Sequence, residues 1–239
     1  MSRICASLVA ISATFLATSL AAFAAPITVP SGLNPGDHYR LAFETSTTTT
    51  PASSDINTYN NFVNSLANAP GSPLAGLSTW TAIASTVAVD ARDNTLTNPN
   101  VGADPSVPVY ALNNTLIALN NAALWSGTLA NPLDVTESGV VVPEYVWTGS
   151  ASNGTAIPVS DLYNQYPLGA GLWPHLGSSQ NATSAWIDYS YGYVGAQNSL
   201  YAISGVLTVA PEPSSIVLTA IATAGFALSS LRGRRRRKR

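Results

Sequence analysis

Hydrophobic and polar positions along this chain form two long apolar runs near its ends and shorter, patterned segments between them. In the interior, residues 38–45 contain β-forming residues with partial alternation of apolar and polar side chains, which predicts a strand. Residues 201–209 predict a closing strand of the same kind. Residues 80–86, 140–142 and 145–148 predict further short strands.

A helix is expected after the first strand. Ser53 or Ser54 can cap a helix that starts near Asp55, and Pro70-Gly71 stops it. Its apolar residues recur at helical spacing and predict one buried face. These residues are Ile56, Tyr59, Phe62, Val63 and Leu66.

A hairpin and a second, shorter helix follow. Residues 107–112 and 115–118 flank the pair Asn113-Asn114, and this composition is typical of a tight turn between two strands. Residues 120–125 predict a short helix that ends at Gly127. Few helices, scattered short strands and long loops favour a single α+β domain without internal repeats.

Composition and charge narrow the class of protein. Only 9% of the 239 residues are charged, while 46% are hydrophobic, so a core can form under a weakly charged surface. Between residues 26 and 210, eleven acidic residues face two arginines, Arg40 and Arg92, a formal net charge of −9. An acidic domain repels phosphate backbones, so nucleic-acid binding is not expected.

The N-terminal residues 1–24 have the pattern of a secretory signal peptide. Arg3 precedes the apolar run 4–20, and Ala22-Phe23-Ala24 supplies an A-x-A site with cleavage between Ala24 and Ala25. An uncleaved membrane anchor is the alternative. The chain's single cysteine, Cys5, lies in this segment, so the mature domain is expected to lack disulfides and thiolate metal sites.

The C-terminal residues 210–239 combine three features in a fixed order. Pro211, Glu212 and Pro213 precede an uncharged apolar segment at about 215–231, which predicts a transmembrane helix. Its sixteen most apolar residues, 216–231, span about 24 Å as a helix, less than the roughly 30 Å of a bilayer core. A basic cluster then predicts a cytoplasmic end: Arg232, Arg234, Arg235, Arg236, Arg237, Lys238 and Arg239.

This tail resembles the PEP-CTERM sorting signal of Gram-negative bacteria. The resemblance covers about residues 211–239 and implies recognition by an exosortase, after processing of the N-terminus by signal peptidase. Cleavage near Pro211-Glu212-Pro213 and transfer to the cell surface or an extracellular matrix would follow. The alternative is an ordinary single-span anchor that keeps the domain outside the cytoplasm.

After a leader loop at 25–38, a series of short motifs extends across about residues 39–209. These motifs are Trp80 to Ile83, Asp90 to Asp93, Val107 to Leu112, Leu116, Ala122, Leu124 to Gly127, Pro132-Leu133, Val146 to Ser150, Asn153-Gly154, Trp186 and Tyr201 to Ile203. In this order they resemble the endostatin-like branch of the C-type-lectin-like fold. The resemblance implies a single domain of short antiparallel strands, one or two helices and long loops. Disulfide-forming cysteines, which stabilise domains of this fold, are absent from residues 39–209 here. The domain must therefore be stabilised by its hydrophobic core.

Catalytic, metal and cofactor sites are not predicted. His38 and His175 lack the spacing of metal ligands and are expected at the surface or at a strand edge. Asp90, Arg92 and Asp93 form the densest charged cluster, in which Arg92 can hold both carboxylates in an ion pair; a ligand site there is the alternative. The calcium-binding motifs Glu-Pro-Asn and Trp-Asn-Asp do not occur.

Aromatic residues near the C-terminal end of the domain give the one hint of a ligand. Trp186, Tyr189, Tyr191 and Tyr193 can form a binding face, although alternate tyrosines also suit one half-buried face of a strand. The expected function is therefore that of an exported, non-catalytic cell-surface or matrix protein, with extracellular polysaccharide or matrix as a possible partner. A secreted hydrolase that uses carboxylates and acts on extracellular polymer is the alternative.

Overall fold

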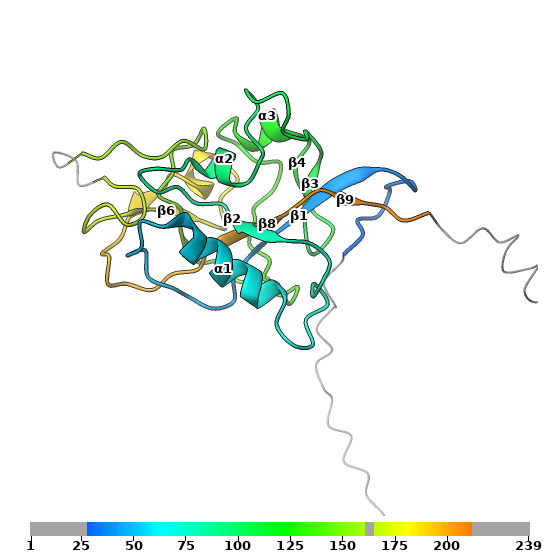
Figure 1. The fold of residues 1–239 in the computed structure, drawn as a ribbon, viewed down its shortest axis with the longest axis horizontal. Coiled ribbons are helices and arrows are strands. Elements are labelled where there is room, and N and C mark those ends of the chain that lie inside the picture. The colour runs from blue at the N-terminus through cyan, green and yellow to red at the C-terminus, as the bar shows by residue number, and fades with distance from the viewer. Residues whose placement is uncertain (1–27, 161–164, 212–239) are drawn as a thin grey trace, which may run out of the picture.

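The central strand of the fold is β1 (His38–Glu44), which lies in a mixed sheet of order β2-β8-β1-β3-β4. The computed structural model describes residues 28–160 and 165–211 (Figure 1). β1 pairs in parallel with β3 (Val109–Ala111) and antiparallel with β8 (Tyr201–Ser204). All of its residues after His38 are buried, as expected for a strand covered on both faces.

The edges of this sheet come from short strands. β2 (Trp80–Ala82) pairs with β8, and β4 (Leu116–Ala118) pairs with β3 across the predicted Asn113-Asn114 turn, in which Asn114 has a positive φ of 72°. β9 (Leu207–Thr208) adds antiparallel to the start of β1. The predicted closing strand is thus real but split into β8 and β9.

Helix α1 (Ile56–Ala67) packs against β2 and β8. Its cap is Asp55, whose carboxylate accepts from the Asn57 amide, and not Ser53 or Ser54 as expected from the sequence. Ser53 instead contributes its hydroxyl oxygen as acceptor for the Asp55 amide. The buried face of the helix is Ile56, Tyr59, Val63 and Ala67, while Phe62 and Leu66 are only partly buried.

A second, smaller sheet has the order β5-β6-β7, with β5 at Tyr145–Trp147, β6 at His175–Ser178 and β7 at Ser190–Tyr191. The amide of Trp147 donates to the Ser199 carbonyl just before β8, which joins the small sheet to the main one. Residues 140–142, predicted as a strand, form only an isolated bridge between Val141 and Val135.

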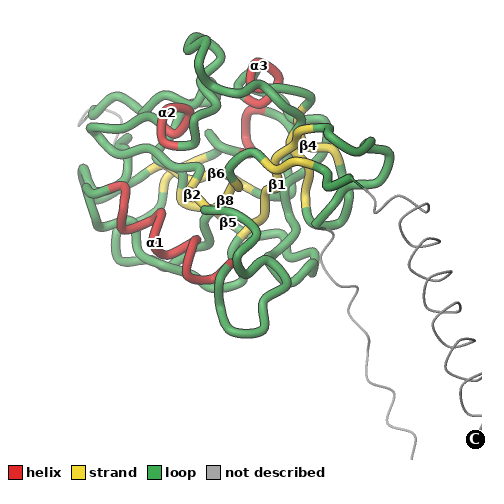
Figure 2. The backbone as a smooth tube through the Cα atoms, turned by 45° about the vertical axis from the view of Figure 1, so that its right-hand side comes forward, coloured by secondary structure: helices red, strands yellow, loops and turns green. Residues whose placement is uncertain are grey.

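Short helices and long loops complete the α+β fold, and Figure 2 shows how much of the chain runs as loops between the elements. α2 covers Ala91–Asn94, α3 covers Asn121–Leu124 with Asn120 as its cap, and a 3-10 helix, η1, covers Ser184–Trp186. The core is rich in aromatic side chains, and its largest fully buried members are Trp80, Trp147, Trp186, Tyr39, Tyr59, Tyr201 and Phe43.

The described chain starts and finishes side by side. The Gly36 amide donates to the Val209 carbonyl, and the Val209 amide donates to the Asp37 carbonyl, both at 2.9 Å. In Figure 1, β9 and β6 lie toward opposite ends of the domain. The last described strand, β9, therefore lies at the end of the domain that is far from β6.

Candidate functional site

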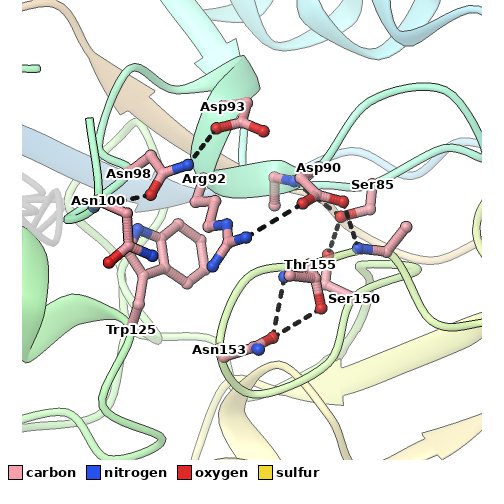
Figure 3. Close-up of polar contacts among 12 residues, drawn as sticks. Ser85, Asp90, Arg92, Asp93, Asn98, Asn100, Trp125, Ser150, Asn153 and Thr155 are labelled. Carbon is pink, nitrogen blue, oxygen red and sulfur yellow. Dashed lines mark hydrogen bonds and ion pairs between the residues drawn. The ribbon is translucent and has the colours of Figure 1, made fainter.

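The predicted charged cluster lies in the loop around α2 (Figure 3). Arg92 pairs with Asp90 at 3.6 Å between Nη2 and Oδ2, and the other oxygen of Asp90 accepts from the Ala156 amide at 2.8 Å. Asp93 accepts instead from the side-chain amide of Asn98, at 2.5 Å. The expectation that Arg92 holds both carboxylates is therefore wrong, because Asp93 has a partner of its own.

Other contacts tie this cluster to neighbouring loops. Trp125 donates its indole N–H to the Thr97 carbonyl at 3.0 Å, and its ring packs on Gly154. A Cβ at Gly154 would come within 2.4 Å of that ring, and the residue has a φ of +79° that favours glycine. The Ser85 hydroxyl oxygen accepts from the Ala91 amide. These contacts hold together the loops that also carry Asp90, Arg92 and Asp93. The charged cluster therefore has the surroundings of a structural ion pair.

A cavity of about 320 Å³ opens beside this cluster. The carboxylate of Asp104 in its wall already accepts from the Asn98 amide. The Oδ1 atom of Asn121 is buried and makes no hydrogen bond within residues 28–160 and 165–211. The cavity is lined by Asn98, Pro99, Val101, Gly102, Asp104, Ser106, Asn120, Asn121 and Ala122.

Arg40 is a buried cation that has no paired carboxylate within salt-bridge distance among the described residues. Its guanidinium donates to the carbonyls of Thr95 and Ser204, at 3.2 and 2.8 Å, and to that of Leu96 at 3.0 Å. Burial lowers the pKa of Arg40, and the charge of Asp104 opposes that shift. Through these three hydrogen bonds Arg40 links the loop after α2 to β8. Arg40 therefore has a structural role.

Glu44, the last residue of β1, is a fully buried carboxyl group. Burial raises the pKa of Glu44 to about 8, with the Ser179 and Ser199 hydroxyls opposing the shift and the charges of Glu144 and Asp134 adding to it. Neither carboxyl oxygen has a hydrogen bond of good geometry within the described chain. At neutral pH this group is mostly protonated, and its burial keeps it away from any substrate.

The two histidines differ in position. His38 is exposed at the start of β1, with Nδ1 2.9 Å from the Thr208 hydroxyl, as expected. His175 is only 4% exposed, so its expected place at the surface is wrong. It lies in the middle strand of the small sheet, with Nδ1 3.1 Å from the Asp188 carboxylate.

Exposed aromatic side chains gather on the small sheet. Of the described phenylalanine, tyrosine and tryptophan residues, only five are exposed, each by 37 to 54%, and we call these five the aromatic face. All other described aromatic residues are buried or half-buried. The aromatic face consists of Tyr145, Trp173, Tyr189, Tyr191 and Tyr193.

Ring contacts divide the aromatic face into two groups. Tyr145 and Tyr189 stack with ring centres 5.8 Å apart and planes 18° apart, and we call them the tyrosine pair. Trp173 meets Tyr191 and Tyr193 edge-on, at 6.1 and 5.7 Å, and we call these three the tryptophan cluster. These separations are in the range of favourable aromatic contacts, so each group supports its own geometry.

Alternation along the chain directs the tyrosines outward. Tyr191 and Tyr193 flank Gly192, where a Cβ would come within 2.7 Å of the buried Trp147 ring and 3.0 Å of Leu176. Gly192 therefore faces the core, and its two neighbours face solvent. The half-buried alternative for these tyrosines is wrong, since all three are exposed.

The sequence prediction identified part of this face. Trp186 was grouped with it, but η1 places that side chain in the core against Trp125 and Tyr201. Tyr145 and Trp173 were missed because they come from other segments and meet the tyrosines only through the pairing of β6 with β5 and β7.

Several sequence predictions fall outside the described residues. They are the signal peptide with Ala24 and Ala25, the residues Glu212 and Pro213, the predicted transmembrane segment and the basic cluster. Pro211 is described and exposed. Within residues 28–160 and 165–211, no helix is long and apolar enough to cross a membrane, and no three histidine, aspartate or glutamate residues gather as a metal site.

Comparison with known proteins adds no family to this picture. No protein-family model matches the chain, and no curated protein matches it with significance.

Proposed function

We propose that this chain is an exported, non-catalytic cell-surface or matrix protein whose domain binds extracellular polysaccharide through the aromatic face. The observation that carries the proposal is the segregation of aromatic side chains. Every exposed aromatic residue of the described chain lies in or beside the small sheet, in two groups of contacting rings, and the other described aromatics are buried or half-buried. An exposed cluster of this kind is typical of a binding site, because apolar ring surface in contact with water is unfavourable and a ligand that covers it lowers the free energy.

Tyrosine and tryptophan suit a sugar ligand. Each presents a flat apolar surface on which the C–H face of a sugar ring can stack, and a hydroxyl or indole N–H that can bond to sugar hydroxyls. They also have few rotatable bonds, so ordering them on binding costs little conformational entropy.

Delivery to the surface follows from the two ends of the chain. We propose that signal peptidase cleaves between Ala24 and Ala25 and that an exosortase recognises Pro211, Glu212 and Pro213 together with the apolar segment and basic cluster that follow. The proposal is supported by the order of these features in the sequence and by the exposure of Pro211 immediately after the last strand.

For the domain itself we propose an endostatin-like, C-type-lectin-like fold. It is supported by the short strands, the few helices and the long loops, while the parallel pairing of β1 with β3 departs from the antiparallel strands that the resemblance implies. The fold is not the basis of the proposed binding, which depends on the aromatic face.

Two measurements test this function. The intact mass of the protein from cell-surface and culture fractions should show loss of both ends; a basic C-terminal cluster retained in all surface material would contradict sorting by an exosortase. The full-length chain should co-sediment with extracellular polysaccharide from the producing cells. Equal co-sedimentation of a Tyr189→Ala, Tyr191→Ala double variant would show that the aromatic face is not the binding site.

A further inference from the structure

Building on the proposed function, we infer that the main sugar contact within the aromatic face is the tryptophan cluster, and that its ligand is an uncharged polysaccharide. The inference depends on three features of the described structure. They are the arrangement of the rings in each group, the hydrogen bonds that fix the tryptophan cluster, and the absence of charged residues from the segments that carry it.

The two groups of the aromatic face differ in how their rings cover one another. Tyr145 and Tyr189 stack with planes only 18° apart, so each ring covers part of one face of the other. In the tryptophan cluster, the planes of Tyr191 and Tyr193 lie at 78° and 61° to that of Trp173, so neither tyrosine stacks flat on the indole. The tryptophan cluster therefore leaves more of its flat ring surface open to a sugar.

Backbone hydrogen bonds fix the tryptophan cluster in place without a ligand. The Gly192 amide donates to the Pro174 carbonyl at 3.0 Å, and the Val194 amide donates to the Leu172 carbonyl at 2.8 Å. These two bonds join the two chain segments that carry the three rings. A surface that is ordered before binding loses little conformational entropy when a ligand arrives, which favours affinity.

The segments that carry the tryptophan cluster contain no charged residue. Residues 162–174 and 189–211 have no aspartate, glutamate, lysine or arginine. His175 lies opposite Tyr191 in the small sheet, but it is only 4% exposed and its Nδ1 lies 3.1 Å from the Asp188 carboxylate. These two segments therefore offer a ligand aromatic surface and neutral polar groups, and no fixed charge.

This distribution of charge favours an uncharged polymer over an anionic one. Carboxylate, sulfate and phosphate groups are typically bound by arginine or lysine, and neither occurs between residues 93 and 231. The formal net charge of −9 on residues 26–210 also repels a polyanion. A neutral sugar needs no such partner, because its C–H faces can stack on the rings and its hydroxyls can bond to their polar groups.

Trp173 supplies a signal that is specific to this site. It is 37% exposed, whereas each of the other four tryptophans of the chain is at most 6% exposed. Acrylamide, an uncharged quencher of fluorescence, should therefore act mainly on Trp173. A ligand that covers the Trp173 ring should reduce this quenching.

The test uses polysaccharide from the producing cells, treated with protease and separated by anion exchange into a neutral and an acidic pool. Binding of the full-length chain in mild detergent is measured by co-sedimentation and, in parallel, by acrylamide quenching. The neutral pool should bind and should protect Trp173, and the acidic pool should do neither. Raising the salt concentration should leave the binding unchanged, because no ion pair contributes to it.

Substitutions then locate the contact. Tyr191→Ala and Tyr193→Ala should each weaken binding of the neutral pool by about tenfold or more. Tyr145→Ala, which removes one ring of the tyrosine pair, should weaken it less than either. Leu119→Ala, an exposed apolar residue beside the main sheet, is the matched control and should bind like the parent. Melting curves of the variants show whether each remains folded.

The possible failures are distinguishable. Binding of the neutral pool without protection of Trp173, or binding that Tyr145→Ala weakens as much as Tyr193→Ala, would overturn the tryptophan cluster as the main contact and leave the proposed function intact. Binding of the acidic pool with protection of Trp173 would overturn the uncharged ligand alone. Binding of neither pool, or binding that none of the three tyrosine variants weakens, would overturn the proposed function itself.

Discussion

Replacement of Glu44 by glutamine should change how the stability of this domain depends on pH. The side chain is fully buried at the end of β1, and burial raises its pKa from 4.5 to about 8. Glutamine has nearly the same shape and is neutral at every pH. The variant therefore removes the titration of this one group while it keeps the packing around it.

The sign and size of the effect follow from proton linkage. Because the pKa is higher in the folded state, the stabilising contribution of Glu44 is complete below about pH 4.5 and is lost as the pH rises toward 8. The free energy of unfolding falls by about 1.4 kcal/mol per pH unit in this window. Between pH 5 and pH 8 the parent should lose about 3 to 4 kcal/mol from this group, and Glu44→Gln should lose none of it.

Urea unfolding at several pH values, followed by tryptophan fluorescence, measures this difference. All other carboxyl groups are common to both proteins, so the difference between the two curves isolates Glu44. Glutamine can add a constant offset through its amide, but it cannot add a slope. Parallel curves for the parent and the variant between pH 5 and pH 8 would refute the reasoning, since they would mean that Glu44 ionises in the folded protein.

Three further substitutions test the loops and the helix. Gly154→Ala should lower the free energy of unfolding by more than about 2 kcal/mol, since its Cβ meets the Trp125 ring and its φ is positive; an unchanged urea midpoint would contradict this packing. Asp55→Ala should cost about 1 kcal/mol through loss of the α1 cap, and Asp55→Asn should restore most of it in the same assay. Arg40→Met should cost about 2 to 4 kcal/mol, because three carbonyls lose their donors; a neutral result would show that water satisfies them.

Much of the main sheet could be predicted because its signals are local. β1 carries Tyr39, Leu41 and Phe43 at alternate positions, and the hairpin of β3 and β4 surrounds an Asn-Asn turn in which Asn114 takes the positive φ that asparagine tolerates. The cap of α1 was misassigned by one or two residues because serine and aspartate cap equally well. Only the geometry of the Asp55 carboxylate separates them.

Of the small sheet, β5 was predicted from residues 145–148, but β6 and β7 could not be predicted, for a physical reason. β6 has the sequence His-Leu-Gly-Ser, which has little β propensity, and it is a strand because β5 and β7 bond to both of its edges. Gly177 is required there because a Cβ would come within 2.0 Å of the Trp186 carbonyl oxygen. Tertiary contacts of this kind have no local signature.

Only part of the aromatic face could be predicted from the sequence, for a related reason. Alternation places Tyr189, Tyr191 and Tyr193 on one side of the chain, but the pattern does not say whether that side faces core or solvent. Gly192 decides it, since the absence of a side chain lets Trp147 close the inner side. Trp173 joins the face only through contacts between segments that are far apart in sequence.

The pairing of β9 with β1 also determines how the domain responds to a pulling force. Tension on the chain beyond residue 211 enters through β9, and β1, β8 and β9 run along the line that joins this exit to the small sheet (Figure 1). Hydrogen bonds between antiparallel strands lie perpendicular to that line, so the pull shears several of them together and does not open them one at a time. β1 shares such bonds with β8 and β9 and pairs in parallel with β3, which makes the centre of the sheet the mechanical link between the two ends of the domain.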